Sequence, residues 1–312
     1  MQSLIHHDEL GMQASSPTCH VPVLLSEIVS GLQPAPGKTI VDGTLGGGGH
    51  TGALAAQVSP GGRVIALDLD PDAIARAQQP LAALPVELVE GGFADLPEIL
   101  ASLSVDLVDG VVLDLGLSSD QLADTERGFS FLGQGPLDLR FNPLQGQPAW
   151  QLLSRLREKP LADLIYQFGE ERYSRRIAKR IVASRRESPI RTADQLAQLV
   201  RSCIPRRRNQ RIDPATRTFQ ALRIAVNDEL VSLKSALDRL PDCLAPGGRL
   251  AVISFHSLED RLVKHSFRED ERLEVLTRRP IRPTEEESER NPRSRSAKLR
   301  IAQRKLRIAQ RK

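Results

Sequence analysis

Three aspartates end strand-like runs, and their chemistry is the easiest to interpret in this sequence. Asp42 follows the β-branched run 39–41, and Asp68 and Asp114 close longer apolar runs further along the chain. Ligands of open α/β sheets bind beyond the carboxyl ends of the strands. We therefore expect the three carboxylates to meet in one crevice, where they suit a ligand that carries hydroxyl groups and positive charge.

A glycine-rich loop follows the first of these acids. Four successive glycines begin at Gly46 and, together with Gly52, satisfy the pattern G-x-G-x-x-G. Glycines let the backbone turn at positive φ and approach a ligand closely, and the helix that follows offers free N–H groups at its start. Asp68 lies about 20 residues beyond, where a nucleotide-binding βαβ unit holds a ribose hydroxyl. This order of features predicts a site for an adenosine-containing cofactor. A solvated glycine loop with a surface aspartate is the weaker alternative.

The elements that position these residues alternate in the manner of an α/β fold with a doubly wound, mostly parallel sheet. Phe93 follows the third expected strand, where such folds cover the adenine, so we expect it beside the base. The apolar positions of the segment 24–29 recur at helical spacing and predict a helix that covers an edge of the sheet. Strands are expected over 39–41, 63–70, 86–89 and 105–115, with helices over 53–58 and 71–83.

The alternation stops at residue 122 and returns near residue 215, which predicts an inserted all-helical subdomain. The insertion is rich in arginine, whose planar guanidinium suits bidentate contact with phosphate, so we expect it to bind an RNA backbone. A solvated charged face is the alternative. Its helices are expected over 150–157, 161–168, 172–184 and 192–203, and its basic residues include Arg172, Arg175, Arg176, Lys179, Arg180, Arg185, Arg186, Arg201 and the run 206–211.

The second part of the core is expected to consist of a long helix over 215–240, a strand that ends at Phe255 and two closing strands. The closing strands fall at 273–277 and 298–302, with a charged loop over 284–296 between them. The chain thus divides into four parts. They are a disordered extension (1–19), the first part of the core (20–121), the helical substrate-binding subdomain (122–214) and the second part of the core with a basic tail (215–312).

Composition indicates a globular protein with an anionic partner. Of the 312 residues, 40% are hydrophobic and 26% charged, and the formal net charge is +4. Cys19, Cys203 and Cys243 are too few and too scattered for a disulfide framework or a zinc site, and we expect no metal. No apolar run is long enough to span a bilayer, and we find no signal-peptide core. We expect a cytoplasmic protein that does not bind membranes.

A dehydrogenase and a methyltransferase can share the βαβ start, so other residues must separate them. Asp42 would repel the pyrophosphate of a dinucleotide, whereas its charge suits an ammonium or sulfonium group. The Pro246-Gly-Gly turn and the element Asp114-Leu-Gly-Leu-Ser-Ser also fit a methyltransferase, and no hydride-transfer tyrosine or lysine motif is apparent. S-adenosylmethionine is therefore preferred to NAD, and an NAD-dependent oxidoreductase stays the alternative from another class.

Several longer motifs resemble one family, the bacterial 16S ribosomal RNA cytosine-N4 methyltransferases known as RsmH or MraW. The resemblance runs from about His20 to Lys305. Its motifs are His20-Val-Pro-Val-Leu-Leu, Asp42-Gly-Thr-Leu-Gly-Gly-Gly-Gly-His50, Asp114-Leu-Gly-Leu-Ser-Ser, Glu126-Arg-Gly-Phe-Ser-Phe131, Gly135-Pro-Leu-Asp-Leu-Arg140, Gly169-Glu-Glu-Arg172, Ala215-Thr-Arg-Thr-Phe-Gln-Ala-Leu-Arg223, Ser254-Phe-His-Ser-Leu-Glu-Asp-Arg261 and Asn291-Pro-Arg-Ser-Arg295.

This resemblance implies a class I S-adenosylmethionine-dependent methyltransferase, Rossmann-like, with an inserted helical subdomain. It implies action on the N4 amine of a cytidine in the decoding centre of 16S ribosomal RNA, within the small ribosomal subunit. Asp120 stands where the family usually has a proline, which loosens the loop before Gln121. The oligomeric state stays open, a homodimer included. The family's cofactor-contacting positions fall on Gly48, Gly49, His50, Asp68, Phe93, Asp114 and Gln121.

The chemistry requires help for a poor nucleophile, because the lone pair of an exocyclic amine is delocalised into the ring. A group that accepts the amine's hydrogen bonds favours a pyramidal nitrogen aligned with the methyl donor. We expect Asp114, with Ser118 or Ser119, to do this. Alternatively Asp114 only binds cofactor, and another acid such as Asp138 acts on the amine.

Two further functions remain open from the sequence. A DNA amino-methyltransferase is disfavoured because the Asp/Asn-Pro-Pro-Tyr element common in that class is missing after the fourth strand. A non-catalytic ribosome-assembly factor is disfavoured by the intact acids at three strand ends. An assay of turnover on RNA and on duplex DNA separates these functions.

Overall fold

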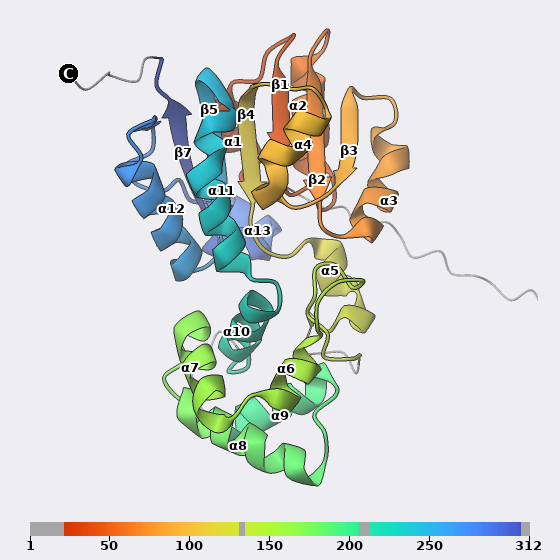
Figure 1. The fold of residues 1–312 in the computed structure, drawn as a ribbon, viewed down its shortest axis with the longest axis vertical. Coiled ribbons are helices and arrows are strands. Elements are labelled where there is room, and N and C mark those ends of the chain that lie inside the picture. The colour runs from red at the N-terminus through yellow and green to blue at the C-terminus, as the bar shows by residue number, and fades with distance from the viewer. Residues whose placement is uncertain (1–21, 131–134, 206–212, 307–312) are drawn as a thin grey trace, which may run out of the picture.

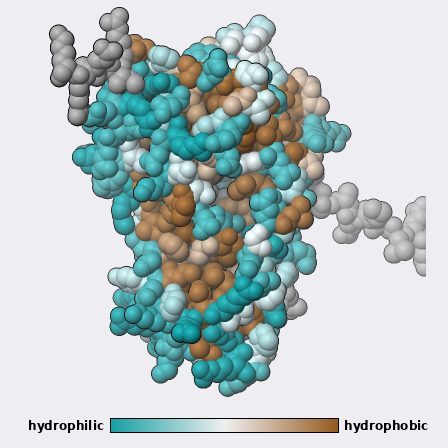
Figure 2. All heavy atoms as spheres, in the orientation of Figure 1, coloured by the Kyte–Doolittle hydropathy of each residue, from teal (hydrophilic) through white to brown (hydrophobic). Residues whose placement is uncertain are grey.

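The computed structural model describes residues 22–130, 135–205 and 213–306. Four predicted features lie outside these ranges: the N-terminal extension, His20, the arginine run 206–211 and the last residues of the basic C-terminal tail. The described chain forms two lobes, a sheet with helices on both faces and a smaller group of helices below it (Figure 1). Figure 2 shows apolar residues in the middle of the same face, between the two lobes. No helix in the described ranges is long and apolar enough to cross a membrane.

The upper lobe is built on one seven-stranded sheet in the order β3-β2-β1-β4-β5-β7-β6. The first five strands run parallel, and β7 pairs antiparallel with both β5 and β6. The prediction of a mostly parallel α/β sheet is confirmed. The strands are β1 (Thr39–Asp42), β2 (Arg63–Asp68), β3 (Val86–Glu90), β4 (Val108–Asp114), β5 (Leu244–Ser254), β6 (Leu273–Val275) and β7 (Lys298–Arg304).

Helices cover both faces because the strand residues are apolar on both sides. Ile40 and Val112 pack beneath α1 (Leu25–Leu32) and α2 (Gly49–Val58), and α3 (Pro71–Leu81) lies beyond them. Val41 and Leu113 face α4 (Leu96–Ser102), α11 (Glu229–Cys243) and α12 (Ser257–Glu269) on the other side. The expectation that α1 covers an edge of the sheet is wrong. Its buried side chains pack against the central strands β4 and β5.

The lower lobe has its own apolar core, formed by helices of the insertion. These are α6 (Ala149–Arg155), α7 (Glu158–Gly169), α8 (Ser174–Glu187) and α9 (Ala193–Cys203), which follow the short α5 (Ser119–Ala123). Helix α10 (Thr216–Val226) joins the same core through Phe219 and Leu222. The division of the chain into units stays a prediction, and this packing leads us to propose that the helical unit extends to Val226.

Two expected elements differ from the structure. The long helix expected over 215–240 is two helices, because Asp228 adopts a left-handed conformation with φ of 49° between α10 and α11. The charged loop expected over 284–296 contains the helix α13 (Glu285–Arg290) and a 3₁₀ helix, η3 (Pro292–Ser296). Thr284 caps α13 by accepting a hydrogen bond from the Glu287 N–H, and the Glu287 carboxylate accepts from the Leu24 N–H at 2.8 Å.

Candidate functional site

A cavity lies at the carboxyl ends of β1, β2 and β4, where the sheet meets the lower lobe. Asp68 and Asp114 line it, together with Gly49, His50 and Phe93. Ser118 and Gln121 line it as well. The structure therefore brings most of the expected site residues together around one space, and two of the three strand-end acids expected to share a crevice, Asp68 and Asp114, line it.

Asp42 differs from the expectation that it faces the ligand. It is 1% exposed and is not among the lining residues. Its Oδ2 accepts from the Thr51 hydroxyl at 2.7 Å, and its Oδ1 accepts from the Thr44 N–H at 3.1 Å. Both hydrogen bonds tie the glycine loop to the end of β1. We therefore propose that Asp42 supports the loop rather than contacting the cofactor.

The glycine loop forms the floor of the cavity. Gly46 and Gly48 have φ values of 51° and 75°, a region that residues with a Cβ adopt only at a cost. Gly46, Gly47 and Gly49 line the cavity, whereas Gly48 turns away toward Leu81. The loop thus presents backbone without side chains to a ligand, as the sequence led us to expect, although Gly48 shapes the turn rather than lining the space.

Asp68 is held at the end of β2 with its carboxylate partly satisfied. Its Oδ2 accepts from the Gly46 N–H at 2.8 Å, and its Oδ1 accepts from the Asp70 N–H at 2.9 Å. Burial raises its pKa to about 6 in spite of these two hydrogen bonds. Each carboxylate oxygen keeps a second lone pair, so the group can still accept from two vicinal hydroxyls such as those of a ribose.

A buried ion pair fixes the chain just beyond Asp68. Arg127 Nη1 lies 3.1 Å from Asp70 Oδ2, and Gln121 Nε2 donates to the same oxygen at 3.3 Å. Arg127 also donates to the backbone carbonyls of Arg140 and Phe141. Gln121 is thus oriented by Asp70 although Asp120 precedes it, and the first turn of the insertion is anchored to the cofactor side of the sheet.

Asp114 has a carboxylate oxygen that lacks a hydrogen-bond partner. Its Oδ1 is buried and has no hydrogen-bond partner, while its Oδ2 lies 3.7 Å from His50 Nδ1. Burial raises the pKa of Asp114 to about 6, with His50 opposing the shift. His50 is oriented by a 2.9 Å hydrogen bond between its Nε2 and the Val23 carbonyl. A buried unpaired acceptor on a cavity wall indicates that a ligand supplies the donor.

The two serines after Asp114 are already engaged. Ser118 begins α5, and its Oγ accepts from the Gln121 N–H at 3.1 Å. Ser119 Oγ accepts from a guanidinium nitrogen of Arg293, and Ser119 does not line the cavity. Asp138 forms a bidentate pair with Arg140 at 2.7 Å and lies outside the cavity lining. Among the acids considered for the amine, the geometry therefore favours Asp114.

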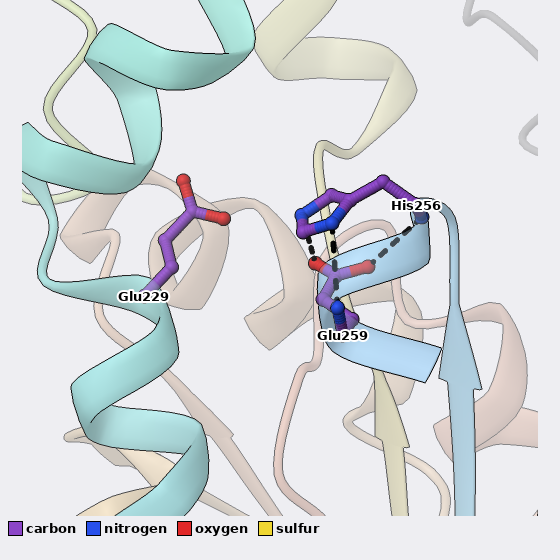
Figure 3. A group of neighbouring side chains, drawn as sticks. All are labelled: Glu229, His256 and Glu259. Atoms are coloured by element: carbon purple, nitrogen blue, oxygen red, sulfur yellow. Dashed lines mark hydrogen bonds and ion pairs between the residues drawn. The ribbon is translucent and has the colours of Figure 1, made fainter. Parts of the chain in front are cut away.

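Residues with no assigned role form a second group of charges at the cavity. Glu229 on α11 and Glu259 on α12 line the space, and the His256 ring lies against the Glu259 carboxylate (Figure 3). The Glu259 carboxylate accepts from the Phe255 N–H at 2.8 Å, and its Oε1 lies 3.0 Å from His256 Nε2. His256 and Glu259 stand in a motif that follows the last parallel strand. That position was the only sequence signal for them.

These three residues have the composition of a metal site, and His256 Nε2 has no hydrogen-bond partner, but both glutamates are engaged within the protein. Their ligand atoms lie within 4.8 Å of one another. Arg223 on α10, however, grips Glu229 through two hydrogen bonds of 2.7 and 2.8 Å. A carboxylate neutralised by a bidentate guanidinium is a poor ligand for a cation. We interpret the group as a buried charge network that joins the two lobes, and the expectation of no metal stays a prediction.

A polar residue in the break between two helices also connects the lower lobe to the cavity. Asn227, in the break between α10 and α11, lines the cavity and accepts from the Phe141 N–H at 2.7 Å. Its Nδ2 donates to the Leu139 and Arg223 carbonyls at 2.7 and 2.9 Å. Phe141 therefore forms part of the cavity wall, and Asn227 holds its backbone in place.

The relation of this chain to known proteins agrees with this geometry. A family model described as the MraW methylase family matches residues 17–305. The chain belongs to the MraW methylase family. It is therefore an S-adenosylmethionine-dependent methyltransferase, and its sheet is that of the class I enzymes, as the sequence motifs led us to expect. The choice of S-adenosylmethionine over NAD is confirmed.

Known relatives are similar over nearly their whole length. The ribosomal RNA small subunit methyltransferase H of Rhodopirellula baltica is 53% identical over 302 residues, which cover 93% of each chain. The protein of the same name from Thermomicrobium roseum is 48% identical and covers 95% of this chain and 96% of its own. A solved rRNA methylase from Streptococcus thermophilus has a TM-score of 0.42 and 12% identity, covering 90% of this chain and 93% of that chain.

Proposed function

We propose that this MraW-family methyltransferase transfers a methyl group to the exocyclic N4 amine of a cytidine in the decoding centre of 16S ribosomal RNA, within the small ribosomal subunit. The relatives' names point to small-subunit ribosomal RNA as the substrate. The observation that carries the choice of an amine is the buried, unpartnered Oδ1 of Asp114 on the cavity wall.

The cavity fits the cofactor. The glycine loop offers close backbone approach, and Asp68 keeps lone pairs for ribose hydroxyls. Phe93 supplies an apolar wall beside them, as expected for the adenine. S-adenosylmethionine, when bound, supplies an electrophilic methyl group on a positively charged sulfur.

The chain's own contribution to the reaction is to hold and orient the amine. Asp114 Oδ1 accepts a hydrogen bond from the N4 amine, which draws the lone pair out of conjugation with the ring. His50 Nε2 donates to the Val23 carbonyl, and this hydrogen bond places Nδ1 3.7 Å from the other carboxylate oxygen. The neutral amine is the nucleophile, and after methyl transfer its proton passes to the Asp114 carboxylate and from there to solvent. Desolvation of Asp114 strengthens the hydrogen bond that it forms.

Helix α8 supports RNA as the macromolecular substrate. Six basic side chains on or beside this helix are exposed, and positive charge on one helix face suits a phosphate backbone. They are Arg172, Arg175, Arg176, Lys179, Arg180 and Arg186. The target base must also leave its stack to enter the cavity.

Mass mapping tests the proposal. Small subunits, naked 16S ribosomal RNA and duplex DNA are each incubated with the protein and methyl-labelled cofactor, and the labelled nucleoside is identified after digestion. We expect N4-methylcytidine from a single site in the subunit or its RNA. Label on the pyrimidine ring carbon, on ribose or only on DNA contradicts the proposal.

A further inference from the structure

Arg293 is the only arginine or lysine among the described residues that line the cavity. It lies on η3, in the segment between α13 and β7, nearly 180 residues after the strand end that it reaches. Its guanidinium donates to the Leu117 carbonyl and to Ser119 Oγ. Both acceptors belong to the turn that follows Asp114, and Arg293 and Asp114 lie close enough for each to influence the pKa of the other.

The anchored guanidinium still has donors to offer. An arginine side chain carries five N–H groups in a planar fork and no acceptor. The two contacts to Leu117 and Ser119 use two of them. Burial lowers the pKa of Arg293, while the nearby carboxylates of Asp114 and Asp120 oppose that shift. The group stays positively charged, because arginine is not deprotonated in proteins.

An acceptor and a donor side by side match one nucleobase edge. Cytosine presents an amine donor at C4 and acceptors at N3 and O2, whereas uracil presents an acceptor at C4 and a donor at N3. Adenine has a comparable amine and ring nitrogen but no carbonyl at the position of O2. Asp114 alone therefore distinguishes cytosine from uracil, and a second group that reads O2 is needed to distinguish cytosine from adenine.

We propose that Arg293 donates a hydrogen bond to the O2 carbonyl of the target cytosine and is a specificity-determining residue of this site. The assignment rests on the proposed function. The competing partner for Arg293 is the carboxylate of the cofactor's methionine moiety, which carries the same kind of acceptor. The glycine loop already offers backbone N–H groups to that carboxylate.

A substrate with a weakened O2 acceptor tests the assignment. Small subunits are reconstituted with ribosomal RNA that carries cytidine or 2-thiocytidine at the target position, because sulfur accepts hydrogen bonds poorly. We expect the 2-thio substitution to lower kcat/KM of the wild-type protein about tenfold. On cytidine, kcat/KM of the variant Arg293→Gln should be roughly 30-fold lower than that of the wild type. For this variant, the change from cytidine to 2-thiocytidine should lower kcat/KM by less than about twofold, because the donor to O2 is already absent.

Matched variants and a binding measurement complete the test. Arg295→Gln changes an exposed arginine of the same 3₁₀ helix and should behave as wild type. Arg293→Lys keeps the cation and should give a partial loss, with a smaller 2-thio effect than wild type. An equal 2-thio penalty in wild type and Arg293→Gln overturns the assignment. So does a cofactor dissociation constant raised more than about tenfold in Arg293→Gln, which would place the cofactor's carboxylate at this arginine. No turnover of cytidine by the wild-type protein, with cofactor binding intact, contradicts the proposed function itself.

Discussion

Burial of Asp114 provides an acceptor for the target amine but lowers the stability of the folded protein at neutral pH. The environment that leaves its Oδ1 without a partner raises its pKa to about 6, because an ionised carboxylate loses solvation there. A group whose pKa is higher in the folded state than in the unfolded state binds more protons when folded. The free energy of unfolding therefore falls as pH rises from about 4 through 6. At neutral pH, ionisation of the buried Asp114 therefore lowers the free energy of unfolding.

Removal of that charge should stabilise the protein. We expect Asp114→Asn to raise the free energy of unfolding at pH 8 by on the order of 2 kcal/mol, because about two pKa units of unfavourable ionisation are lost. The gain should shrink as pH falls from 6 and vanish near pH 4, where the carboxyl is protonated in both the folded and the unfolded state. Denaturant unfolding at several pH values measures this. Asp106→Asn, at an exposed aspartate, is the control and should change little. A less stable Asp114→Asn at pH 8 would refute the argument.

The same pKa predicts the acid limb of the activity profile. The neutral carboxyl of Asp114 is a weaker acceptor than its carboxylate, so kcat/KM should fall below about pH 6. Asp68 titrates in the same range, and its effect should appear in cofactor affinity. We therefore expect methyl transfer at saturating cofactor and cofactor binding by calorimetry to weaken separately below pH 6. A profile that stays flat to pH 5 contradicts both carboxylate roles.

At the scale of elements, the break between α10 and α11 joins the lobes. Asn227 satisfies three backbone groups, two of them in the 139–141 segment of the insertion. We expect Asn227→Ala to cost about 2 kcal/mol of stability, since buried backbone groups lose their partners. It should also raise KM for RNA more than KM for cofactor. Asn227→Asp keeps the acceptor for the Phe141 N–H and should lose less. Equal stability of Asn227→Ala and wild type would show that water replaces these hydrogen bonds.

The charge network of Glu229, His256 and Glu259 predicts that divalent metal ions do not change the stability of the protein. Since Arg223 donates to both oxygens of Glu229, and Glu259 accepts from the Phe255 N–H, a divalent cation would have to compete with these donors for the carboxylates. Dialysis against a chelator, and addition of Zn²⁺, Mn²⁺ or Mg²⁺, should shift the Tm of the free protein by less than about 1 °C. Specific binding would raise it by several degrees. Such a rise with one ion, lost in His256→Ala, would show that the cluster is a metal site.

Sequence patterns predicted the elements around the glycine loop because their signals are local. Strand β1, the glycines and Asp68 lie within thirty residues of one another, and each strand end carries its own acid. The α10–α11 break had no such signal, since neither glycine nor proline marks it. Asp228 breaks the helix by its left-handed conformation, and Asn227 beside it accepts from a backbone segment 86 residues away in sequence. Arg293 and Glu229 were missed for the same reason, because only the tertiary fold brings them to the cavity.

Asp42 illustrates a different limit of sequence reasoning. Its place at the end of β1 was read correctly, but its side chain turns beneath the loop, where two threonine groups donate to it. The position of an acid at a strand end is thus predictable from sequence. Whether the acid faces the ligand depends on nearby donors, and here Thr44 and Thr51 supply them.

At the scale of the whole molecule, we propose that the lower lobe binds RNA and that the upper lobe binds the cofactor. Substitution of four exposed cations on α8 by glutamine should weaken RNA binding and leave cofactor affinity unchanged. For single-stranded contacts, the slope of log K against log salt should fall by about 3. The four positions are Arg175, Arg176, Lys179 and Arg180.

The control neutralises the same number of exposed cations on the upper lobe, and it should leave the salt slope nearly unchanged. If both sets of substitutions weaken binding equally, net charge rather than α8 accounts for the affinity. The control positions are Lys264, Arg268, Arg278 and Arg279.

The most direct test of the account is single-turnover methyl transfer by Asp114→Ala, measured together with cofactor affinity. If Asp114 Oδ1 accepts from the target amine, the rate of methyl transfer at saturating cofactor falls at least about 100-fold. The dissociation constant for S-adenosylmethionine then changes by less than about threefold. Methyl transfer at the wild-type rate, or a loss that saturating cofactor restores, contradicts the account and leaves Asp114 as a cofactor ligand only.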